Sequence, residues 1–339
     1  MKNISILAVT CSLSLFASAK VITVNNNTNS PGQYSSLQQA IDSASAGDSI
    51  YVHGSATSYG NVTIKKRLNF FGTGNMPNKT NTLVSEVGTF QLDTLSGVSG
   101  ASGTKISGFK VKDIKGYAGA GGTKNVMISR NYFTSGAAKV NITGKGWTLQ
   151  NNIIFNSSVY VNNYPNTTIR NNIFSHCSIT TSNQATVLIT NNDFLGSSSA
   201  LTTVSNALIA NNIFSGATPN GTAVGTNTMS NNLTYQTTSD IIPSGTNTGS
   251  GNFVAQDPKF MNVTANNFSY TFDFTLTATS PGKGTGTDAT DIGIYGGISP
   301  FVDMTGTPAI PQIKTLTIVN PVISVGDTLQ VIIKAKKQD

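Results

Sequence analysis

Residues 151–194 read NNIIFNSSVYVNNYPNTTIRNNIFSHCSITTSNQATVLITNNDF, and the pair Asn-Asn returns in this stretch every twenty residues. Related phrases continue the repeat on both sides, as RNYF from Arg130, NNIF from Asn211, NNLT from Asn231 and GNFV from Gly251. The second residues of these phrases are spaced by 20 or 21 positions: Asn131, Asn152, Asn172, Asn192, Asn212, Asn232 and Asn252. Such a regular period is typical of a solenoid.

Hydrophobic residues accompany each asparagine of the series. Those three positions before it and two positions after it form two columns, which we expect in the core: Ile128, Leu149, Ile169, Ile189, Ile209 and Met229, then Phe133, Ile154, Phe174, Phe194, Phe214 and Thr234. Twenty residues are too few for helical repeats, which need about 33. The pattern therefore favours coils of short parallel strands.

Stacked parallel strands would place the asparagines one above another, about 4.8 Å apart. An asparagine amide can donate to the coil on one side and accept from the coil on the other, and asparagine tolerates the left-handed backbone of a sharp bend. We therefore predict an internal asparagine ladder in a single bend. The column directly after the ladder contains Asp193 among apolar residues. We interpret that carboxylate as facing solvent.

The flanking segments point to a known architecture. Residues 36–46 have an amphipathic helical pattern, with an apolar face made of Leu37, Ala40, Ile41 and Ala44, and the run GDSIYV follows from Gly47. Residues 61–73 alternate like strands, and DPKF from Asp257 and DIGIYGG from Asp291 lie near the end of the repeats. With these motifs, the chain resembles exported bacterial right-handed parallel β-helix proteins of the pectin-lyase-like superfamily.

This resemblance covers residues 21–300 and implies an all-β fold. The helix would cap the first coil, GDSIYV would be that coil's first strand, and the motifs after Asp257 would form the closing coils. The expected organisation is a signal peptide over residues 1–19, a right-handed parallel β-helix over residues 20–300, and a linker with a small β-hairpin over residues 301–339. Because this scaffold carries lyases, hydrolases, epimerases and adhesins, it does not define an activity.

The N-terminus predicts export. Lys2, an apolar run from Ile4 to Phe16 and the sequence Ala17-Ser18-Ala19 are typical of a cleaved secretory signal. We therefore expect a secreted or cell-surface protein without a transmembrane segment after cleavage. Such a chain would retain one cysteine, Cys177, and would depend on a large core rather than on disulfides.

The C-terminal segment predicts two strands, over residues 315–319 and 328–335, after a linker that contains prolines. Two roles are open for this hairpin. It would cover the open edge of the last coil, which its short length favours, or it would dock the protein for secretion or surface attachment.

The repeats lack the acids that carbohydrate cleavage commonly requires. Between Ile114 and Ser239 the sole acid is Asp193, so the coils offer neither a carboxyl pair for hydrolysis nor a calcium site. His53 and His176 have no orienting acid nearby in the sequence. We expect no metal and no cofactor. Nucleic acid is not an expected partner either, since no binding motif is present.

Positive charge is concentrated over residues 105–145, which contain eight basic residues and one acid, in a chain whose net charge is +7. Lys124 and Lys145 each precede a ladder asparagine by seven positions, while Lys139 and Tyr160 each follow one by eight. One interpretation is that these four residues line a groove for an anionic sugar chain. The other, which the spacing alone favours, is that the lysines only keep the outer surface soluble.

Two functions remain open. The favoured one is non-catalytic binding of an anionic polysaccharide or cell-surface glycan. The other is a metal-independent polysaccharide lyase in the basic coils, where Lys, Arg or Tyr would supply the base and neutralise the uronate carboxylate.

Overall fold

The computed structural model describes most of the chain after residue 18. The described residues are 19–28, 32–77, 82–94, 100–119, 121–134, 139–162, 166–182, 186–197, 199–219, 225–301 and 312–336. The predicted signal segment lies outside them, apart from Ala19. No helix in the described part of the chain is long and apolar enough to cross a membrane.

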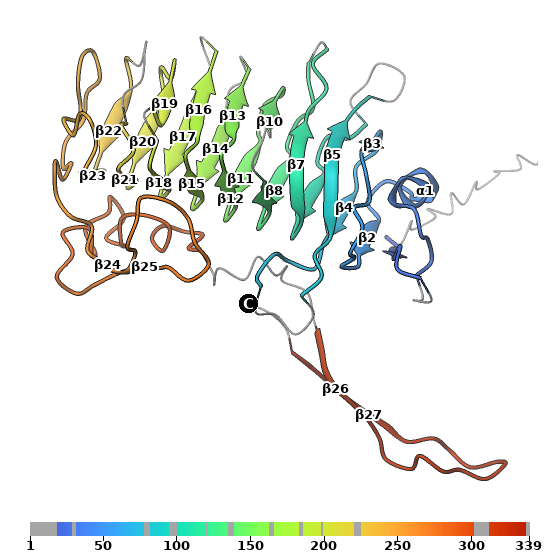
Figure 1. Cartoon of the computed structure of the whole chain (residues 1–339). Coiled ribbons are helices and arrows are strands. Elements are labelled where there is room, and N and C mark those ends of the chain that lie inside the picture. Colours follow the sequence, from blue (N-terminus) through green and yellow to red (C-terminus); the bar gives the residue numbers. More distant parts are fainter. Residues whose placement is uncertain are drawn as a thin grey trace, which may run out of the picture.

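The predicted parallel β-helix is confirmed (Figure 1). Its coils stack through parallel strand pairs in a ten-stranded and a thirteen-stranded sheet. We call the ten-stranded sheet face A. Its strands, in spatial order, are β1 (Val21–Val24), β2 (Ser49–Val52), β4 (Asn69–Phe71), β6 (Lys105–Ser107), β8 (Met127–Ser129), β11 (Thr148–Gln150), β14 (Thr167–Arg170), β17 (Val187–Thr190), β20 (Leu208–Ala210) and β22 (Thr228–Ser230).

The larger sheet is divided into two faces, because most coils contribute two short strands to it. Face B contains β9 (Tyr132–Phe133), β12 (Ile153–Phe155), β15 (Ile173–Ser175), β18 (Asp193–Leu195), β21 (Ile213–Ser215) and β23 (Leu233–Tyr235). Face C contains β3 (Val62–Ile64), β10 (Lys139–Ile142), β13 (Ser158–Val161), β16 (Ser178–Thr181) and β19 (Leu201–Thr202). The longer strand β7 (Lys110–Lys115) pairs with both β9 and β10, and it pairs with β5 (Glu86–Leu92) on its other side.

Both predicted core columns are buried. Phe174, Phe194 and Phe214 stack with ring centroids 4.7 and 4.8 Å apart, which is the spacing of neighbouring strands. Trp147 is also fully buried, and its indole nitrogen donates to the Thr123 carbonyl at 2.5 Å. Each fully buried large apolar side chain contributes about 1.5–3 kcal/mol, so the stacked coils form an extensive core.

The asparagine ladder is confirmed as well. From Asn131 to Asn232, each side-chain amide donates to the carbonyl oxygen of the next ladder side chain, at 2.9–3.2 Å. The ladder residues from Asn131 to Asn232 are fully buried. The ladder thus satisfies the polar groups of the bend inside the core.

The ladder asparagines do not adopt the left-handed backbone conformation that we expected of them. That conformation belongs to the residue just before each of them, with φ of 51–58° at Asn151, Asn171, Asn191, Asn211 and Asn231. The correction has a simple reason. The left-handed residue turns the chain, and the turn directs the next side chain into the core, so two successive asparagines perform two different tasks.

The N-terminal helix is confirmed as α1 (Leu37–Ser43). The Ser36 hydroxyl accepts a hydrogen bond from the Gln39 backbone amide and caps the helix. All four apolar residues of the predicted helix face are buried. One detail differs: β1 precedes the helix and pairs in parallel with β2, so the GDSIYV run supplies the second strand of face A rather than the first.

Parallel pairing ends at a bridge between Leu233 and Phe253, and the next residues fold back instead of forming the further coils that we expected up to about residue 300. They contain β24 (Phe260–Asn262) and β25 (Asp273–Leu276), an antiparallel pair beside the last coils (Figure 1). We call residues 285–301 the strap. Its buried side chains pack on the outer side of face B, in clusters that contain Ile153, Ile173 and Ile213.

The left-handed asparagines fasten the strap. Asn231 donates to the Thr285 carbonyl at 2.8 Å, Asn171 to the Ile294 carbonyl at 2.8 Å, and Asn151 to the Ser299 carbonyl at 3.1 Å. Asn211 exchanges two hydrogen bonds with Thr287. The strap therefore runs along the coils in the direction opposite to their order in the sequence.

The C-terminal hairpin consists of β26 (Gln312–Ile318) and β27 (Val331–Lys336). It extends away from the coils (Figure 1), and residues 315–335 are exposed apart from the half-buried Asn320. The favoured role of this hairpin, as a cover for the last coil, is therefore wrong. Residues 240–253 cover that edge, with Ile242 buried in the core and the Thr248 carbonyl accepting from the Met229 amide.

Candidate functional site

The candidate site lies on face C, where the strands present polar side chains outward. Across six neighbouring strands, the residues in register are Gln91, Lys115, Asn141, Tyr160, Thr180 and Thr202. We call this set the polar row. All six are half-buried, whereas the alternating positions point into the core. The row spans about 24 Å, because neighbouring strands lie about 4.8 Å apart.

Contacts between neighbouring strands hold parts of this face in place. Gln91 donates to the Leu92 carbonyl at 3.2 Å and to the Lys115 carbonyl at 3.5 Å. The side chain of Asn162 donates to that of Asn141 at 2.5 Å. The surface therefore offers amide, hydroxyl and ammonium groups in fixed positions, which suits a ligand rich in hydroxyl groups.

Lys139 and Tyr160 lie on adjacent strands of face C, but not in the same column as we predicted. Lys139 pairs with Ser158, and Tyr160 pairs with Asn141. The reason is a longer connection: six positions separate Phe133 from Lys139, whereas four separate the equivalent Ile154 from Ser158. Counting from the ladder therefore shifts the register by two residues.

Lys124 and Lys145 occupy equivalent positions, as predicted. Both are exposed and lie three residues before the paired residues Met127 and Thr148 of face A. The Asn125 amide donates to the Lys145 carbonyl at 2.9 Å, which joins the two turns. These turns form the corner between faces C and A, so the two ammonium groups flank one end of the strands that carry the polar row.

Two acids of β5 and β7 are paired with lysines. Glu86 lies 2.8 Å from Lys110, and Asp113 lies 3.3 Å from Lys115. Asp113 is opposite Thr89 across β5 and β7, which places it about 10 Å along the strands from Glu86. Both carboxylates are held by lysines, which is unlike the acid and base of an inverting glycosidase.

The prediction that Asp193 faces solvent is wrong. Its side chain is fully buried under the strap, where a Cβ added to Gly293 would lie 2.5 Å from the Asp193 Oδ1 atom. Neither carboxylate oxygen has a hydrogen-bond partner in the described part of the chain. Desolvation raises the pKa of Asp193 well above its usual value, and the nearby Ile294 backbone amide lowers that pKa only in part.

The two histidines and the cysteine lie in surroundings that do not suit catalysis. His53 and His176 are exposed, and the His176 ring contacts the Gly196 carbonyl. Cys177 is buried and donates to the Ile154 carbonyl at 3.0 Å, and burial raises the pKa of its thiol to about 12. This thiol is therefore protonated at neutral pH and is a poor nucleophile.

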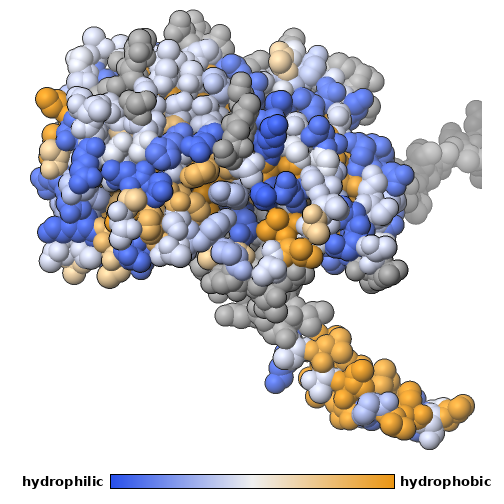
Figure 2. Space-filling model, in the orientation of Figure 1, coloured by the Kyte–Doolittle hydropathy of each residue, from blue (hydrophilic) through white to orange (hydrophobic). Residues whose placement is uncertain are grey.

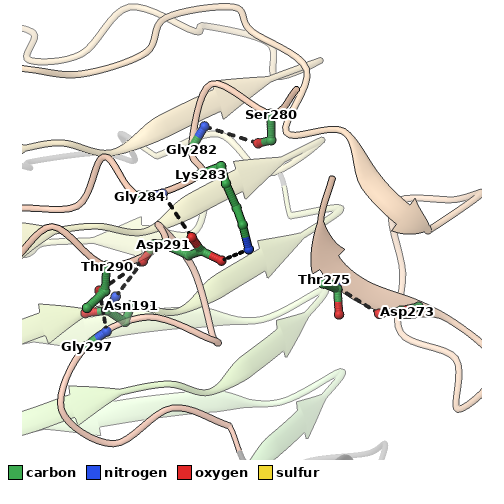
Figure 3. A network of polar contacts seen from close by, with 10 residues as sticks. All are labelled: Asn191, Asp273, Thr275, Ser280, Gly282, Lys283, Gly284, Thr290, Asp291 and Gly297. Carbon is green, nitrogen blue, oxygen red and sulfur yellow. Dashed lines mark hydrogen bonds and ion pairs between the residues drawn. The ribbon is translucent and has the colours of Figure 1, made fainter. Parts of the chain in front are cut away.

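The C-terminal acids Asp291 and Asp273 stabilise turns (Figure 3). Asp291 forms an ion pair with Lys283 at 2.7 Å and accepts from the Gly284 amide at 2.9 Å. Asp273 accepts from the Thr275 amide at 2.9 Å. Across the described residues, no group of three or more His, Cys, Asp or Glu side chains is arranged to hold a metal ion.

Sequence reasoning missed most of the polar row. The signal was present, because KVNI from Lys139 and SVYV from Ser158 align through their inward-facing apolar residues. Aligning the strands by this alternation, rather than by distance from the ladder, gives the observed register.

Comparison with protein-family models gives no match, and comparison with curated proteins gives none either.

Proposed function

We propose that this protein is a secreted or surface-attached member of the pectin-lyase-like superfamily that binds an anionic polysaccharide without cleaving it. The observation that carries the proposal is the polar row on face C beside the exposed corner of Lys124 and Lys145. An extended polysaccharide laid along the solenoid axis would meet one strand at a time. The strand spacing is close to the length of one sugar unit. Each successive sugar would therefore lie over one strand and meet the outward side chain of that strand.

Each part of the surface has a separate task in this proposal. The amide and hydroxyl groups of the row would bind sugar hydroxyls, and the half-buried Tyr160 ring would offer a stacking surface. The corner lysines would attract uronate carboxylates. Because these ammonium groups are exposed, their contribution would depend strongly on ionic strength.

The alternative is a metal-independent polysaccharide lyase on the same face. Lys115 and Tyr160 belong to the same row, with Asn141 between them, and such residues can act as base and neutraliser. Binding without cleavage is favoured because Asp113, the buried acid beside this row, is held in an ion pair with Lys115.

Changing Lys124, Lys139 and Lys145 together to glutamine should weaken binding to polygalacturonate or alginate about tenfold or more at low salt. Each exposed charge contributes up to about 1 kcal/mol, and 1.4 kcal/mol corresponds to a tenfold change. Titration calorimetry at two salt concentrations measures this, and the wild-type affinity should fall as salt rises. A matched variant with the exposed residues Lys20, Lys259 and Lys283 changed to glutamine loses the same charge outside face C and should bind normally. Equal weakening in both variants would show that only net charge matters.

The purified protein should show no glycosidase activity and no calcium-dependent lyase activity on the same polysaccharides. The reason is that Glu86 and Asp113 are held in ion pairs with Lys110 and Lys115. Reducing-end assays and the ultraviolet absorbance of unsaturated ends provide the measurement. Calcium-dependent release that is lost in Glu86→Gln or Asp113→Asn would contradict this prediction and support a lyase.

A further inference from the structure

A cavity of about 360 Å³ lies where the last coils meet the segment that folds back beside them. One wall comes from Ser215 and Tyr235, which pair at the ends of β21 and β23, and from the following Gln236. The other wall comes from residues 257–260 and 263–266. Around β24 and β25, hydrophilic and hydrophobic residues lie next to each other on the surface (Figure 2). The volume is within the range of sites for small molecules.

The DPKF motif lines this cavity over its whole length. The Asp257 carboxylate accepts from the Lys259 backbone amide at 2.8 Å, which fixes its position. The Lys259 ammonium group donates to the Thr279 carbonyl at 3.2 Å and forms no ion pair with Asp257. The Phe260 ring is half-buried in the same wall. The motif therefore gives the cavity a positioned carboxylate next to an aromatic ring.

A chain of hydrogen bonds orders the opposite wall. The Ser215 hydroxyl donates to the Asn266 side-chain oxygen at 2.9 Å, and the Asn266 amide donates to the Gln236 side-chain oxygen at 3.3 Å. Two glycines make room for Asn266, because a Cβ at Gly216 would collide with its side chain and a Cβ at Gly196 with its carbonyl oxygen. Since the Gln236 oxygen accepts within this chain, its NH₂ group supplies N–H donors at the cavity.

The chemistry of the lining selects a neutral molecule rich in hydroxyl groups. Asp257 and Lys259 are the charged residues of the lining, so the cavity has no net charge. A carboxylate accepts hydrogen bonds from hydroxyl groups, and the Gln236 amide donates to their oxygens. The half-buried rings of Tyr235 and Phe260 offer apolar surface to the C–H groups of a sugar ring. A uronate would instead bring a second carboxylate close to Asp257.

We propose that this cavity binds one neutral sugar unit through its hydroxyl groups. The residues of the cavity differ from those of the polar row and of the lysine corner. The proposal therefore does not rest on polysaccharide binding at face C. A single sugar unit makes few contacts, so its Kd should be about 1 mM.

Ligand-observed NMR titration of the full chain tests the proposal, with methyl glycosides of glucose, galactose and mannose up to about 50 mM. At least one of the three should bind saturably, and its affinity should stay the same as salt rises, because the ligand is uncharged. The methyl glycoside of galacturonic acid should bind more weakly than that of galactose. The absence of saturable binding to all three neutral glycosides would overturn the proposal, as would tighter binding of the uronide.

Asp257→Asn should weaken binding of the neutral glycoside about fivefold to tenfold, because an amide is a weaker acceptor than a carboxylate. The turn should persist, since the asparagine oxygen can still accept from the Lys259 amide. Asp273→Asn is the matched control. Asp273 accepts from the Thr275 amide at 2.9 Å in the same kind of turn and lies outside the lining, so this variant should bind like the wild type.

Gln236→Asn tests the opposite wall, and it should also weaken binding severalfold because the shorter side chain withdraws the amide. Asparagine suits this corner, since Gln236 has a φ of 52° and Asn156 occupies the equivalent position of an earlier coil with a φ of 46°. The variant with Lys124, Lys139 and Lys145 changed to glutamine should keep its affinity for the neutral glycoside. Equal effects of the two aspartate variants would place the sugar elsewhere and overturn the proposal.

Discussion

Replacing Asn192 by leucine should lower the free energy of unfolding by about 3–5 kcal/mol. Asn192 is fully buried in the middle of the ladder, where its oxygen accepts from the backbone and side chain of Asn172 at 3.0 Å. Its amide donates to the Ile169 carbonyl and to Asn212. Leucine has a similar volume, so the loss comes mainly from buried polar groups left without partners, each worth about 1–3 kcal/mol.

Asn252→Leu is the matched control, because it removes the same side chain from the end of the same ladder. Asn252 accepts from Asn232 and donates to the Met229 carbonyl, but it is half-buried and water can replace part of these bonds. Its effect should be less than half as large. Chemical denaturation of the wild type and of both variants gives the comparison. A midpoint of Asn192→Leu equal to that of the wild type would show that the ladder does not stabilise the coils.

Replacing Asp193 by asparagine should remove a pH dependence of stability from the protein. The carboxyl group lies between Ile173 and Ile213 in face B, under the strap, and neither oxygen has a described partner. Burial raises the pKa of Asp193 in the folded protein, so the folded chain holds this proton more tightly than the unfolded chain does.

The direction in which stability changes with pH follows from the protons bound by the folded and unfolded chains. Below the usual aspartate pKa, the group is neutral in both states and imposes no penalty. As the pH rises above that value, the unfolded chain releases the proton while the folded chain keeps it, so stability falls until the raised pKa is reached. With 1.36 kcal/mol per pKa unit, the penalty at pH 7 reaches at most about 4 kcal/mol.

Denaturation of the wild type and of Asp193→Asn from about pH 3.5 to about pH 8 should give a difference in unfolding free energy that favours asparagine increasingly as the pH rises. Asp42→Asn, on the exposed surface of α1, serves as the control and should show no such trend. A constant difference across this pH range would contradict the prediction and would show that the site admits water or a counter-ion.

The repeated Asn-Asn pair explains why the C-terminal part of the chain folds back rather than continuing the coils. The second asparagine has its hydrogen bonds inside the ladder, while the first turns the chain and keeps its side-chain amide at the surface. Five successive coils thus present a column of amides at one corner, from Asn151 to Asn231, and the strap lies along it. Apolar residues such as Ile173 and Ile213 are covered at the same time.

The candidate surface uses another side of the same coils. Face B is covered by the strap, whereas face C keeps its polar row exposed to a ligand. A ligand that follows the solenoid axis therefore has face C and the adjoining lysine corner available. The outward side chains of face C become uncharged beyond Tyr160, where Thr180 and Thr202 continue the row.

The sequence by itself determined the features that repeat. The twenty-residue period, the two core columns and the ladder were predicted because each coil faces a neighbour of nearly identical sequence, so local spacing fixes the contacts. The helix α1 was predicted for a similar reason, since its apolar face and Ser36 cap are local signals.

Only the tertiary structure decided which non-repeating segments cover the coils and where the irregular connections place their side chains. Asp193 looked exposed because the strap that covers it comes about 100 residues later and does not share the repeat. The register of Lys139 against Tyr160 depended on two additional residues in the connection before Lys139. The position of the hairpin was also not predictable from its sequence, because its strands stay exposed instead of packing on the last coil. A periodic pattern specifies the contacts between repeats, whereas burial by a non-repeating segment depends on the path of the whole chain.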